Sequence, residues 1–408
     1  MHAARTAQPA PPRKALPWTR WFGRFEVRAD GEHHCLLRDW LQEAGVRRPW
    51  SVFADRTDLA LEQAFFHEGL APAVWGSFPT PVEDRPRDTD DSLFWQFPCR
   101  TEAQAFERHA RLSRPVVRNG SLHCYLGLPW ATFIDRDQWP QTEASITQIR
   151  LRGLRGALAD CGLSLRVHTV CQHIHWQRLV PRWRDLSVTD LWLSHLPREG
   201  LAPEAAEGLT VHPWSLYAVN VEDPDRRVGL TLGKDPAHRR WLASFSGAHM
   251  PHYLSDVRLK LKALSDEPDM RIEVNTEAWH FEGVVYAHQV RNEPIVQHYR
   301  IGESVRRYNE ALSDSVFALC PAGAGPNTLR LWEALAVGSI PVLLGPEPML
   351  PQGAGARTID WDKAVLRCDV QQMAELPARL RAMPLPERRA RQAAAQAAYA
   401  QVLKQLCF

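Results

Sequence analysis

The chain has 408 residues, of which 45% are hydrophobic, and this is enough material for two packed domains of a globular protein. Its 49 basic and 47 acidic residues leave a formal net charge of +2, which excludes a global field that would attract nucleic acid or an anionic membrane. No run of about 18 apolar residues occurs, so the sequence predicts no transmembrane segment.

The beginning of the chain and its cysteines indicate a cellular location. Residues 1–17 are rich in Ala, Pro and Arg without the apolar core of a signal peptide, and we interpret them as a disordered tail. The 8 cysteines are scattered without a paired spacing, which is typical of reduced thiols. The sequence therefore predicts a cytoplasmic protein.

Residues 18–215 are expected to form a first domain. Residues 18–118 carry many proline and acidic interruptions and predict no clear order of elements. From about residue 120 strand and helix patterns alternate, which favours a parallel sheet covered by helices. Strands are expected at 122–126, 132–134, 164–170 and 190–194, and helices at 143–159 and 176–186. Turn-rich sequence between residues 197 and 229 predicts the crossing to a second domain.

The second domain is expected at residues 228–385, followed by a terminal helix at 386–408. Its central unit is a strand at 316–320, a glycine loop at 321–325, a helix at 326–337 and a strand at 339–344, preceded by strands at 241–246 and 270–274. Pro326 suits the first helical position, and Gly338 suits the left-handed residue after the last turn. The backbone N–H groups at this helix start have no intrahelical partner and would bind an anion.

Arg330 and Glu333 on this helix favour a ligand over a surface ion pair. A cation near the helix start and an anion further along both oppose the helix dipole, so helix stability does not explain them. An arginine beside a phosphate and a carboxylate that accepts two ribose hydroxyls would explain both residues by charge-assisted hydrogen bonds.

The order of residues 319–335 and 338–342 resembles the donor-site signature of exostosin-type glycosyltransferases. Residues 240–248, followed by Asp256, Val257 and Arg258, resemble the strand and helix that open the donor domain of that family. The resemblance covers roughly residues 228–350. One departure is Ala322, because family members often carry a basic residue there, and Arg330, Arg258 or His249 would have to replace it.

The resemblance implies a bacterial-type enzyme with an α/β GT-B fold: two Rossmann-like domains facing across a cleft, with a C-terminal helix. A nucleotide sugar, with a UDP-sugar favoured, would supply the sugar, and a glycan or lipid-linked acceptor in surface polysaccharide or lipopolysaccharide synthesis would take it. No cofactor and no divalent metal are expected. The residues implied in donor binding are Gly247, Arg258, Gly323, Gly325, Asn327, Thr328, Arg330 and Glu333.

Polar residues that follow strands of the first domain are candidates for the acceptor side, because ligands of doubly wound sheets sit beyond the carboxyl ends of the strands. Three clusters qualify, at residues 135–137, 171–175 and 194–195. A transfer with inversion needs a base for the acceptor hydroxyl proton, and Asp135 and His173 are our candidates, with Arg330 stabilising the leaving group. Cys171, His173 and His175 alternate as zinc ligands would, but a fourth ligand is missing.

Four alternatives remain open. A β-Kdo transferase of GT-B fold would use CMP-Kdo and a carboxylate nucleophile, for which Asp235 and Asp256 are candidates that also fit turns or helix caps. A metal-dependent GT-A enzyme would use Asp135 and Asp137 as an Asp-x-Asp motif, although that pattern recurs elsewhere in the chain. A nicotinamide site would use the glycine loop, but its third position is Thr328. The fold would also suit a non-catalytic protein that binds nucleotide sugar or glycan.

Overall fold

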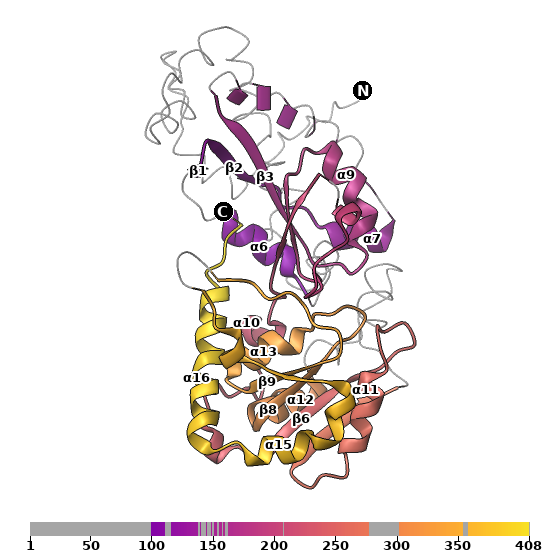
Figure 1. The fold of residues 1–408 in the computed structure, drawn as a ribbon, viewed down its shortest axis with the longest axis vertical. Helices are drawn as coiled ribbons and strands as arrows, with labels where there is room; N and C mark the ends of the chain where they lie inside the picture. The colour runs from indigo at the N-terminus through magenta and orange to yellow at the C-terminus, as the bar shows by residue number, and fades with distance from the viewer. Residues whose placement is uncertain are drawn as a thin grey trace, which may run out of the picture.

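The computed structural model describes residues 99–110, 116–137, 162–206, 208–276, 302–353 and 358–407, with scattered positions between 139 and 160. These residues form two α/β halves, each built on a five-stranded sheet (Figure 1). The expected pair of Rossmann-like domains is thereby confirmed. The predicted tail at residues 1–17 lies outside the described residues.

The first sheet has the strand order β1-β2-β3-β4-β5. β1 is antiparallel to β2, and every other neighbouring pair is parallel. Its strands are β1 (Val116–Arg118), β2 (Ser121–Tyr125), β3 (Ser164–Cys171), β4 (Asp190–Leu193) and β5 (Thr210–Pro213). Its helices are α6 (Thr101–Ala110), α7 (Trp130–Arg136), η3 (Trp176–Leu179), α9 (Val180–Asp185) and η4 (Pro203–Ala206), and several described positions within 143–159 are also helical.

Two sequence predictions in this domain are wrong. Residues 132–134, expected as a strand, lie in α7, where the buried Trp130, Ala131 and Ile134 share one helical face. The Glu102 carboxylate accepts the Ala131 N–H at 3.1 Å and so satisfies the start of this helix. Residues 211–213, expected within a turn-rich crossing, form the edge strand β5, because they pair in parallel with β4.

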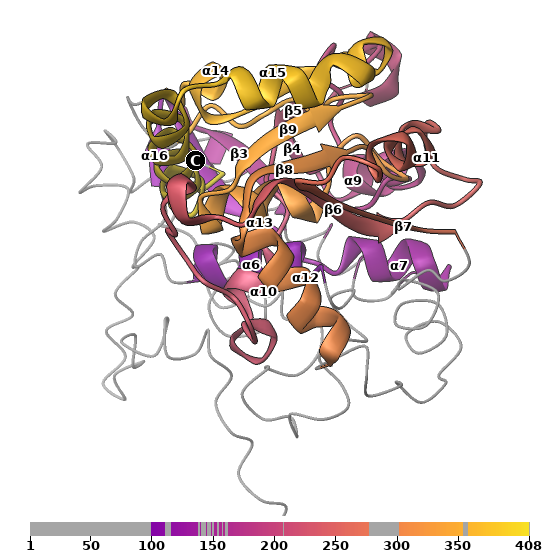
Figure 2. The ribbon, with the colours of Figure 1, turned by 90° about the horizontal axis from the view of Figure 1, so that it is seen from below.

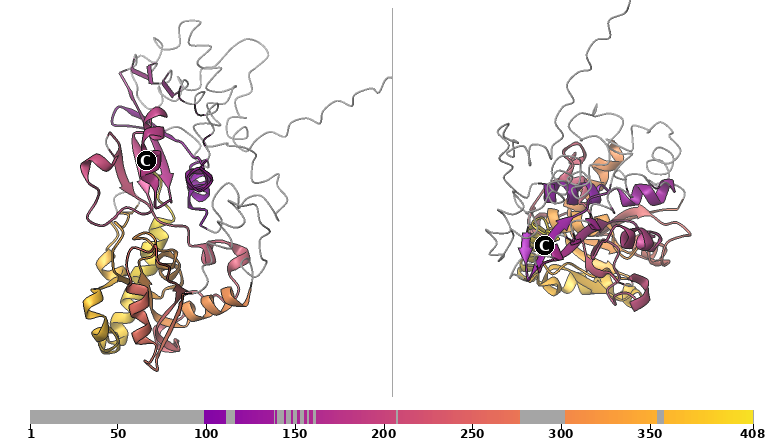
Figure 3. Two further views of the ribbon diagram at one scale, coloured as in Figure 1. Left: turned by 90° about the vertical axis from the view of Figure 1, so that its right-hand side faces the viewer. Right: turned by 90° about the horizontal axis from the view of Figure 1, so that it is seen from above.

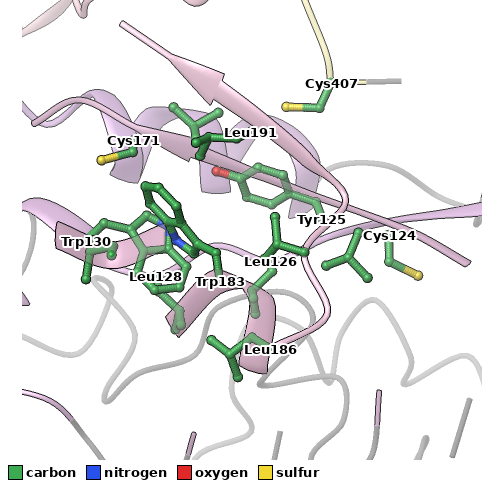
Figure 4. Packing of buried hydrophobic residues seen from close by; sticks show 14 of the residues in the cluster. Cys124, Tyr125, Leu126, Leu128, Trp130, Cys171, Trp183, Leu186, Leu191 and Cys407 are labelled. Atoms are coloured by element: carbon green, nitrogen blue, oxygen red, sulfur yellow. The ribbon is translucent and has the colours of Figure 1, made fainter. Parts of the chain in front are cut away.

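The core of the first domain is aromatic. Trp130 and Trp183 are fully buried with their rings in an edge-to-face arrangement, and the Trp130 indole N–H donates to Thr169 Oγ1 at 2.7 Å. Figure 4 shows these rings beside Tyr125 and Cys171, with Cys407 from the end of the chain in the same cluster. The most buried tryptophans of this half therefore serve packing.

The second sheet is parallel throughout, with the order β10-β9-β8-β6-β7. Its strands are β6 (Trp241–Ala248), β7 (Met270–Asn275), β8 (Ser315–Pro321), β9 (Ile340–Leu344) and β10 (Leu366–Cys368). One face packs on α13 and α16 and the other on α11, η7 and α15, so the sheet lies between two helical layers (Figure 2). The short elements before β6 are α10 (Val219–Glu222), η5 (Pro224–Arg226) and η6 (Pro236–His238). The later helices are α11 (Val257–Lys260), η7 (Leu261–Leu264), α12 (Glu303–Ser313), α13 (Leu329–Val337), α14 (Trp361–Ala364), η10 (Val370–Glu375), α15 (Leu376–Ala382) and α16 (Leu385–Val402).

The central helix α13 begins later than the sequence predicts. Its N-cap is Thr328, and Pro326 belongs to the preceding loop. Asn327 explains the difference, because its Oδ1 accepts hydrogen bonds from the Thr328 N–H and the Trp332 indole N–H, both at 2.9 Å. The other end agrees with the prediction, since Gly338 is left-handed with φ of 75°.

The terminal helix α16 packs against α13 and α14, and the chain then returns to the first domain (Figures 1 and 3). There the Cys407 N–H donates to His109 Nε2 at 3.0 Å. None of the described helices is long and apolar enough to cross a membrane. The described cysteines are buried free thiols, namely Cys99, Cys124, Cys171, Cys320, Cys368 and Cys407.

Candidate functional site

The order of the second sheet places a topological switch point between β6 and β8. From β6 the chain adds β7 on one side, then returns to add β8, β9 and β10 on the other side. Connections on the two sides of a switch point leave a crevice beyond the carboxyl ends of the strands, where ligands of doubly wound sheets bind. Here β6 ends at Ala248 and β8 at Pro321, directly before the glycine loop.

The glycine loop presents free backbone donors. Its first residues are fixed, because the Ala322 N–H donates to Leu344 O at 3.1 Å and Gly323 O accepts from the Leu254 N–H at 3.0 Å. Within the part of the chain that the structure describes, the N–H groups of Ala324, Gly325 and Asn327 have no acceptor. Such amides at the start of a helix are suited to an oxyanion.

Two arginines lie at the same switch point. Arg258 donates to Ala248 O at 2.7 Å and to Ala322 O at 2.9 Å, and Arg330 donates to Ser246 O. Among the described residues, the partners of these guanidinium groups are backbone carbonyl oxygens and aromatic rings, not carboxylates. Burial lowers the pKa of Arg258 to about 10, so the group keeps its charge at neutral pH. Backbone carbonyls therefore hold both guanidinium groups at the carboxyl edge of the sheet.

Glycines at this edge make room for the arginines. A Cβ atom on Gly323 would lie 2.8 Å from Arg258 Nη2, and one on Gly247 would lie 3.3 Å from an Arg330 nitrogen. Thr328 is the N-cap of α13, but its side chain makes no capping hydrogen bond. The structure therefore brings the predicted donor residues around one point, and their roles in binding stay predictions.

Glu333 is buried and already engaged by hydrogen-bond donors. Its side chain accepts from the Asn220 N–H at 3.1 Å and from the Tyr308 hydroxyl at 2.5 Å. Burial holds the pKa of Tyr308 well above its usual range, so the phenol stays protonated and donates. Sequence reasoning missed Tyr308 and Asn220, because both lie outside the motif and meet Glu333 only through the fold.

The two candidate bases of the first domain form a pair. His173 Nε2 lies 3.0 Å from Asp135 Oδ1, and the side chain of each residue is 7% exposed. The His175 backbone N–H donates to His173 Nδ1 at 3.0 Å, so the imidazole proton resides on Nε2 and points to the carboxylate. His173 thus orients Asp135.

The first domain touches the glycine loop directly. The Asn327 amide donates to Ser194 O at 2.7 Å, across the boundary between the two domains. A Cβ atom on Gly325 would lie 2.3 Å from His195 Nδ1 and 2.8 Å from Ile174. Two of the predicted polar clusters, 171–175 and 194–195, therefore meet the donor loop, and the third joins them through Asp135.

The remaining acidic candidates have other partners. Asp235 caps η6 by accepting the Ala237 N–H at 2.8 Å and pairs with Arg389 on α16, so it acts as a cap. Asp256 pairs with Lys260 at 3.1 Å on the surface of α11. Asp137 pairs with the exposed Arg178 at 3.0 Å, whereas Asp135 turns to His173. Within the described ranges, no cluster of three or more His, Cys, Asp or Glu residues could hold a metal ion.

The fold and site define a two-domain α/β protein whose second sheet carries two arginines and a glycine loop at its switch point. Residues 211–383 match the family model of the Exostosin GT47 domain. An 80-residue segment is 35% identical to a probable glucuronosyltransferase of Oryza sativa subsp. japonica, and covers 20% of this chain and 18% of that protein. These matches support a glycosyltransferase of the exostosin type.

Two solved structures resemble the chain weakly. The GtfA/B complex gives a TM-score of 0.28 at 9% identity, covering 64% of this chain and 60% of that one. Acinetobacter baumannii MurG gives a TM-score of 0.27 at 13% identity, covering 66% of this chain and 82% of that one. At such TM-scores the likeness carries no argument, and the fold assignment rests on the two sheets themselves.

Proposed function

We propose that this protein is a metal-independent glycosyltransferase that moves a sugar from a nucleotide-sugar donor, with a UDP-sugar favoured, to a glycan or lipid-linked acceptor. We place the reaction in surface polysaccharide or lipopolysaccharide synthesis of a bacterial type, in the cytoplasm. The observation that carries the proposal is the pair of guanidinium groups of the half-buried Arg258 and the buried Arg330, which lie beside the glycine loop at the switch point.

A diphosphate fits this chemistry. Two fixed cations and several aligned N–H donors neutralise an anion that gains charge as the sugar leaves, which is the role a divalent cation plays in metal-dependent transferases. Because these donors are fixed by backbone carbonyls, little reorganisation is needed when charge develops. In this proposal Arg258 and Arg330 bind the phosphates and Glu333 binds the ribose hydroxyls.

The acceptor would approach from the first domain. We assign the proton transfer to Asp135, with His173 Nε2 donating to one oxygen of its carboxylate and holding it in place. The acceptor hydroxyl loses its proton to Asp135 while its oxygen forms a bond to the anomeric carbon, and the nucleotide leaves with the electron pair of the broken bond. This is an inverting displacement.

A thermal-shift screen with UDP, GDP, CMP, their common sugars and NAD, with and without Mn²⁺, tests the proposed function, because a ligand of the native state raises the unfolding midpoint. We expect UDP or GDP to stabilise the protein without metal. Stabilisation by CMP alone would favour the β-Kdo transferase, and stabilisation by NAD alone would overturn the glycosyltransferase. Binding of a donor that is never turned over would favour a non-catalytic protein.

The role of Glu333 is tested by Glu333→Gln with UDP and its 2′-deoxy analogue. Glu333→Ala is the weaker choice, because it leaves the Asn220 N–H and the Tyr308 hydroxyl without their acceptor. If the carboxylate binds ribose, the natural protein prefers UDP by about tenfold or more, since a hydrogen bond to a charged group contributes about 1.5–3 kcal/mol. Isothermal calorimetry should show most of this preference lost in Glu333→Gln.

Tyr308→Phe is the matched control for this experiment. It removes the hydroxyl that donates to Glu333 and leaves the carboxylate, so the preference for UDP over the 2′-deoxy analogue should persist. An unchanged preference in Glu333→Gln would show that the carboxylate only holds α10 and α12 in place.

A further inference from the structure

His195 has a buried nitrogen without a partner, directly beside the glycine loop. Its Nδ1 atom is enclosed and accepts or donates no hydrogen bond within the part of the chain that the structure describes. An unsatisfied buried polar atom costs about 1–3 kcal/mol, so such an atom in a folded protein calls for an explanation. A ligand that enters at the glycine loop would supply the missing partner.

Gly325 shows that the close approach of His195 is built into the loop. The Gly325 backbone does not have a positive φ, so its conformation alone does not require glycine. A side chain is excluded instead by the first domain, since a Cβ atom would lie 2.3 Å from His195 Nδ1 and 2.8 Å from Ile174. The loop has glycine at the point where the imidazole of the other domain reaches it.

The position of His195 matches one part of the donor. In the proposed function the transferred sugar faces the acceptor side, which would place the phosphate that carries this sugar between the glycine loop and the first domain. The hydrogen bond from Asn327 to Ser194 O holds the residue before His195 against the loop. Burial lowers the pKa of His195 to about 3, so the ring is neutral at pH 7 and can donate one N–H.

We propose that His195 Nδ1–H hydrogen-bonds the phosphate that joins the nucleotide to the transferred sugar, so that the first domain takes part in donor binding. This inference rests on the proposed function and adds a donor contact from the acceptor domain. His195 then distinguishes a nucleoside diphosphate from a monophosphate, and it contributes to the stabilisation of the leaving phosphate.

Calorimetric titration of UDP and UMP into the full chain and its variants tests this contact; GDP and GMP replace them if the screen selects guanine. His195→Ala should weaken diphosphate binding by about tenfold, which equals one hydrogen bond to a charged group, and leave monophosphate binding within about twofold. His195→Asn should restore most of the affinity, because its amide nitrogen takes the place of Nδ1. Ile174→Ala truncates a side chain that faces Gly325 and has no hydrogen-bonding group, so its effect should stay below about threefold.

The outcomes separate this inference from the function on which it rests. Wild-type protein that binds no nucleoside diphosphate would overturn the proposed function and the contact together. Two results would overturn the contact alone, provided that the wild-type protein binds the diphosphate. One is an unchanged affinity in His195→Ala, and the other is an equal loss of affinity for UDP and UMP in that variant. An Ile174→Ala loss as large as that of His195→Ala would show a packing contact. If His195→Ala fails to fold, His195→Asn against His195→Leu gives the same comparison.

Discussion

Asp135 and His173 show how far single residues could be identified from the sequence. Each was a candidate because it follows an expected element of a doubly wound domain. Their hydrogen bond of 3.0 Å was not foreseeable, because α7 replaces the strand expected at residues 132–134. Asp135 stands near the end of that helix, and the helix turns its carboxylate toward the end of β3. The pairing depends on a fold detail that a short apolar run does not encode.

Asp135→Asn should abolish transfer and spare donor binding. The amide fills the same space and still contacts His173, but it cannot take a proton, so kcat should fall by at least about 100-fold. UDP affinity should stay within about twofold, because Asp135 is not among the residues assigned to donor binding. Nucleotide release from the sugar donor in the presence of acceptor measures the first quantity, and calorimetry measures the second.

Asp137→Asn is the control within the same Asp-x-Asp motif. Its carboxylate is 90% exposed and pairs with the exposed Arg178, so we expect less than a twofold change in kcat. Equal losses in both variants would contradict the assignment of Asp135 and revive a role for the motif as a whole.

At the scale of elements, the sequence predicts buried regular segments and misses those defined by contacts with other parts of the chain. The strands around the glycine loop are continuous apolar runs, as buried parallel strands should be, and the structure confirms them. β5 was missed because its residues 210–213 resemble a turn and gain their conformation from pairing with β4. The start of α13 was misplaced because the Asn327 side chain caps the chain where Pro326 suggested a helical residue.

Gly338→Ala tests the predicted end of α13. The residue is left-handed with φ of 75°, which costs about 1–2 kcal/mol for a residue with a Cβ atom. The new atom would also lie 2.9 Å from Gln392 and 3.0 Å from Gln396 on α16. We expect a loss of about 2–3 kcal/mol in the free energy of unfolding, measured by urea denaturation.

Gly233→Ala separates the backbone effect from the packing effect. Gly233 is also left-handed, with φ of 67°, but the nearest atom to its Cβ position is 3.5 Å away. Its cost should therefore be about 1–2 kcal/mol, from the backbone alone. Equal losses of unfolding free energy in the two variants would show that α16 accommodates the Cβ atom at residue 338 without a packing penalty.

At the scale of the whole molecule, the two domains are joined by contacts that sequence patterns do not reveal. Asn327 holds the glycine loop to Ser194 O. Near it, the Met349 N–H donates to Leu196 O at 2.7 Å, so residues after β9 pair with residues after β4. At the far end Cys407 enters the core of the first domain. These contacts bring the donor loop and the first domain together, which a transfer between two substrates requires.

His109 makes the contact of Cys407 with the first domain sensitive to acid. Its Nε2 accepts the Cys407 N–H at 3.0 Å, its Nδ1 lies 2.6 Å from Ala105 O, and its ring stacks on Tyr125. Only a ring with a proton on Nδ1 and none on Nε2 satisfies both hydrogen bonds. Burial lowers the pKa of His109 to about 3, with a smaller effect from Arg108 in the same direction.

The unfolded chain therefore binds a proton at His109 before the folded chain does. The contribution of His109 to stability is present above about pH 6.5 and is lost as the pH falls toward 3, at up to about 1.4 kcal/mol per pH unit. His109→Phe keeps a ring on Tyr125 and removes the titration. The free energy of unfolding of this variant should be lower than that of the wild type at pH 7 and should fall less steeply toward pH 4. The difference in slope corresponds to at most one fewer proton taken up on unfolding. His168 and His195, which are also held neutral by burial, should maintain the remaining slope.

Urea denaturation at several pH values measures these slopes, and the exposed His238→Gln should behave as wild type. An unchanged slope in His109→Phe would show that acid acts elsewhere and that the C-terminal contact does not depend on a neutral imidazole.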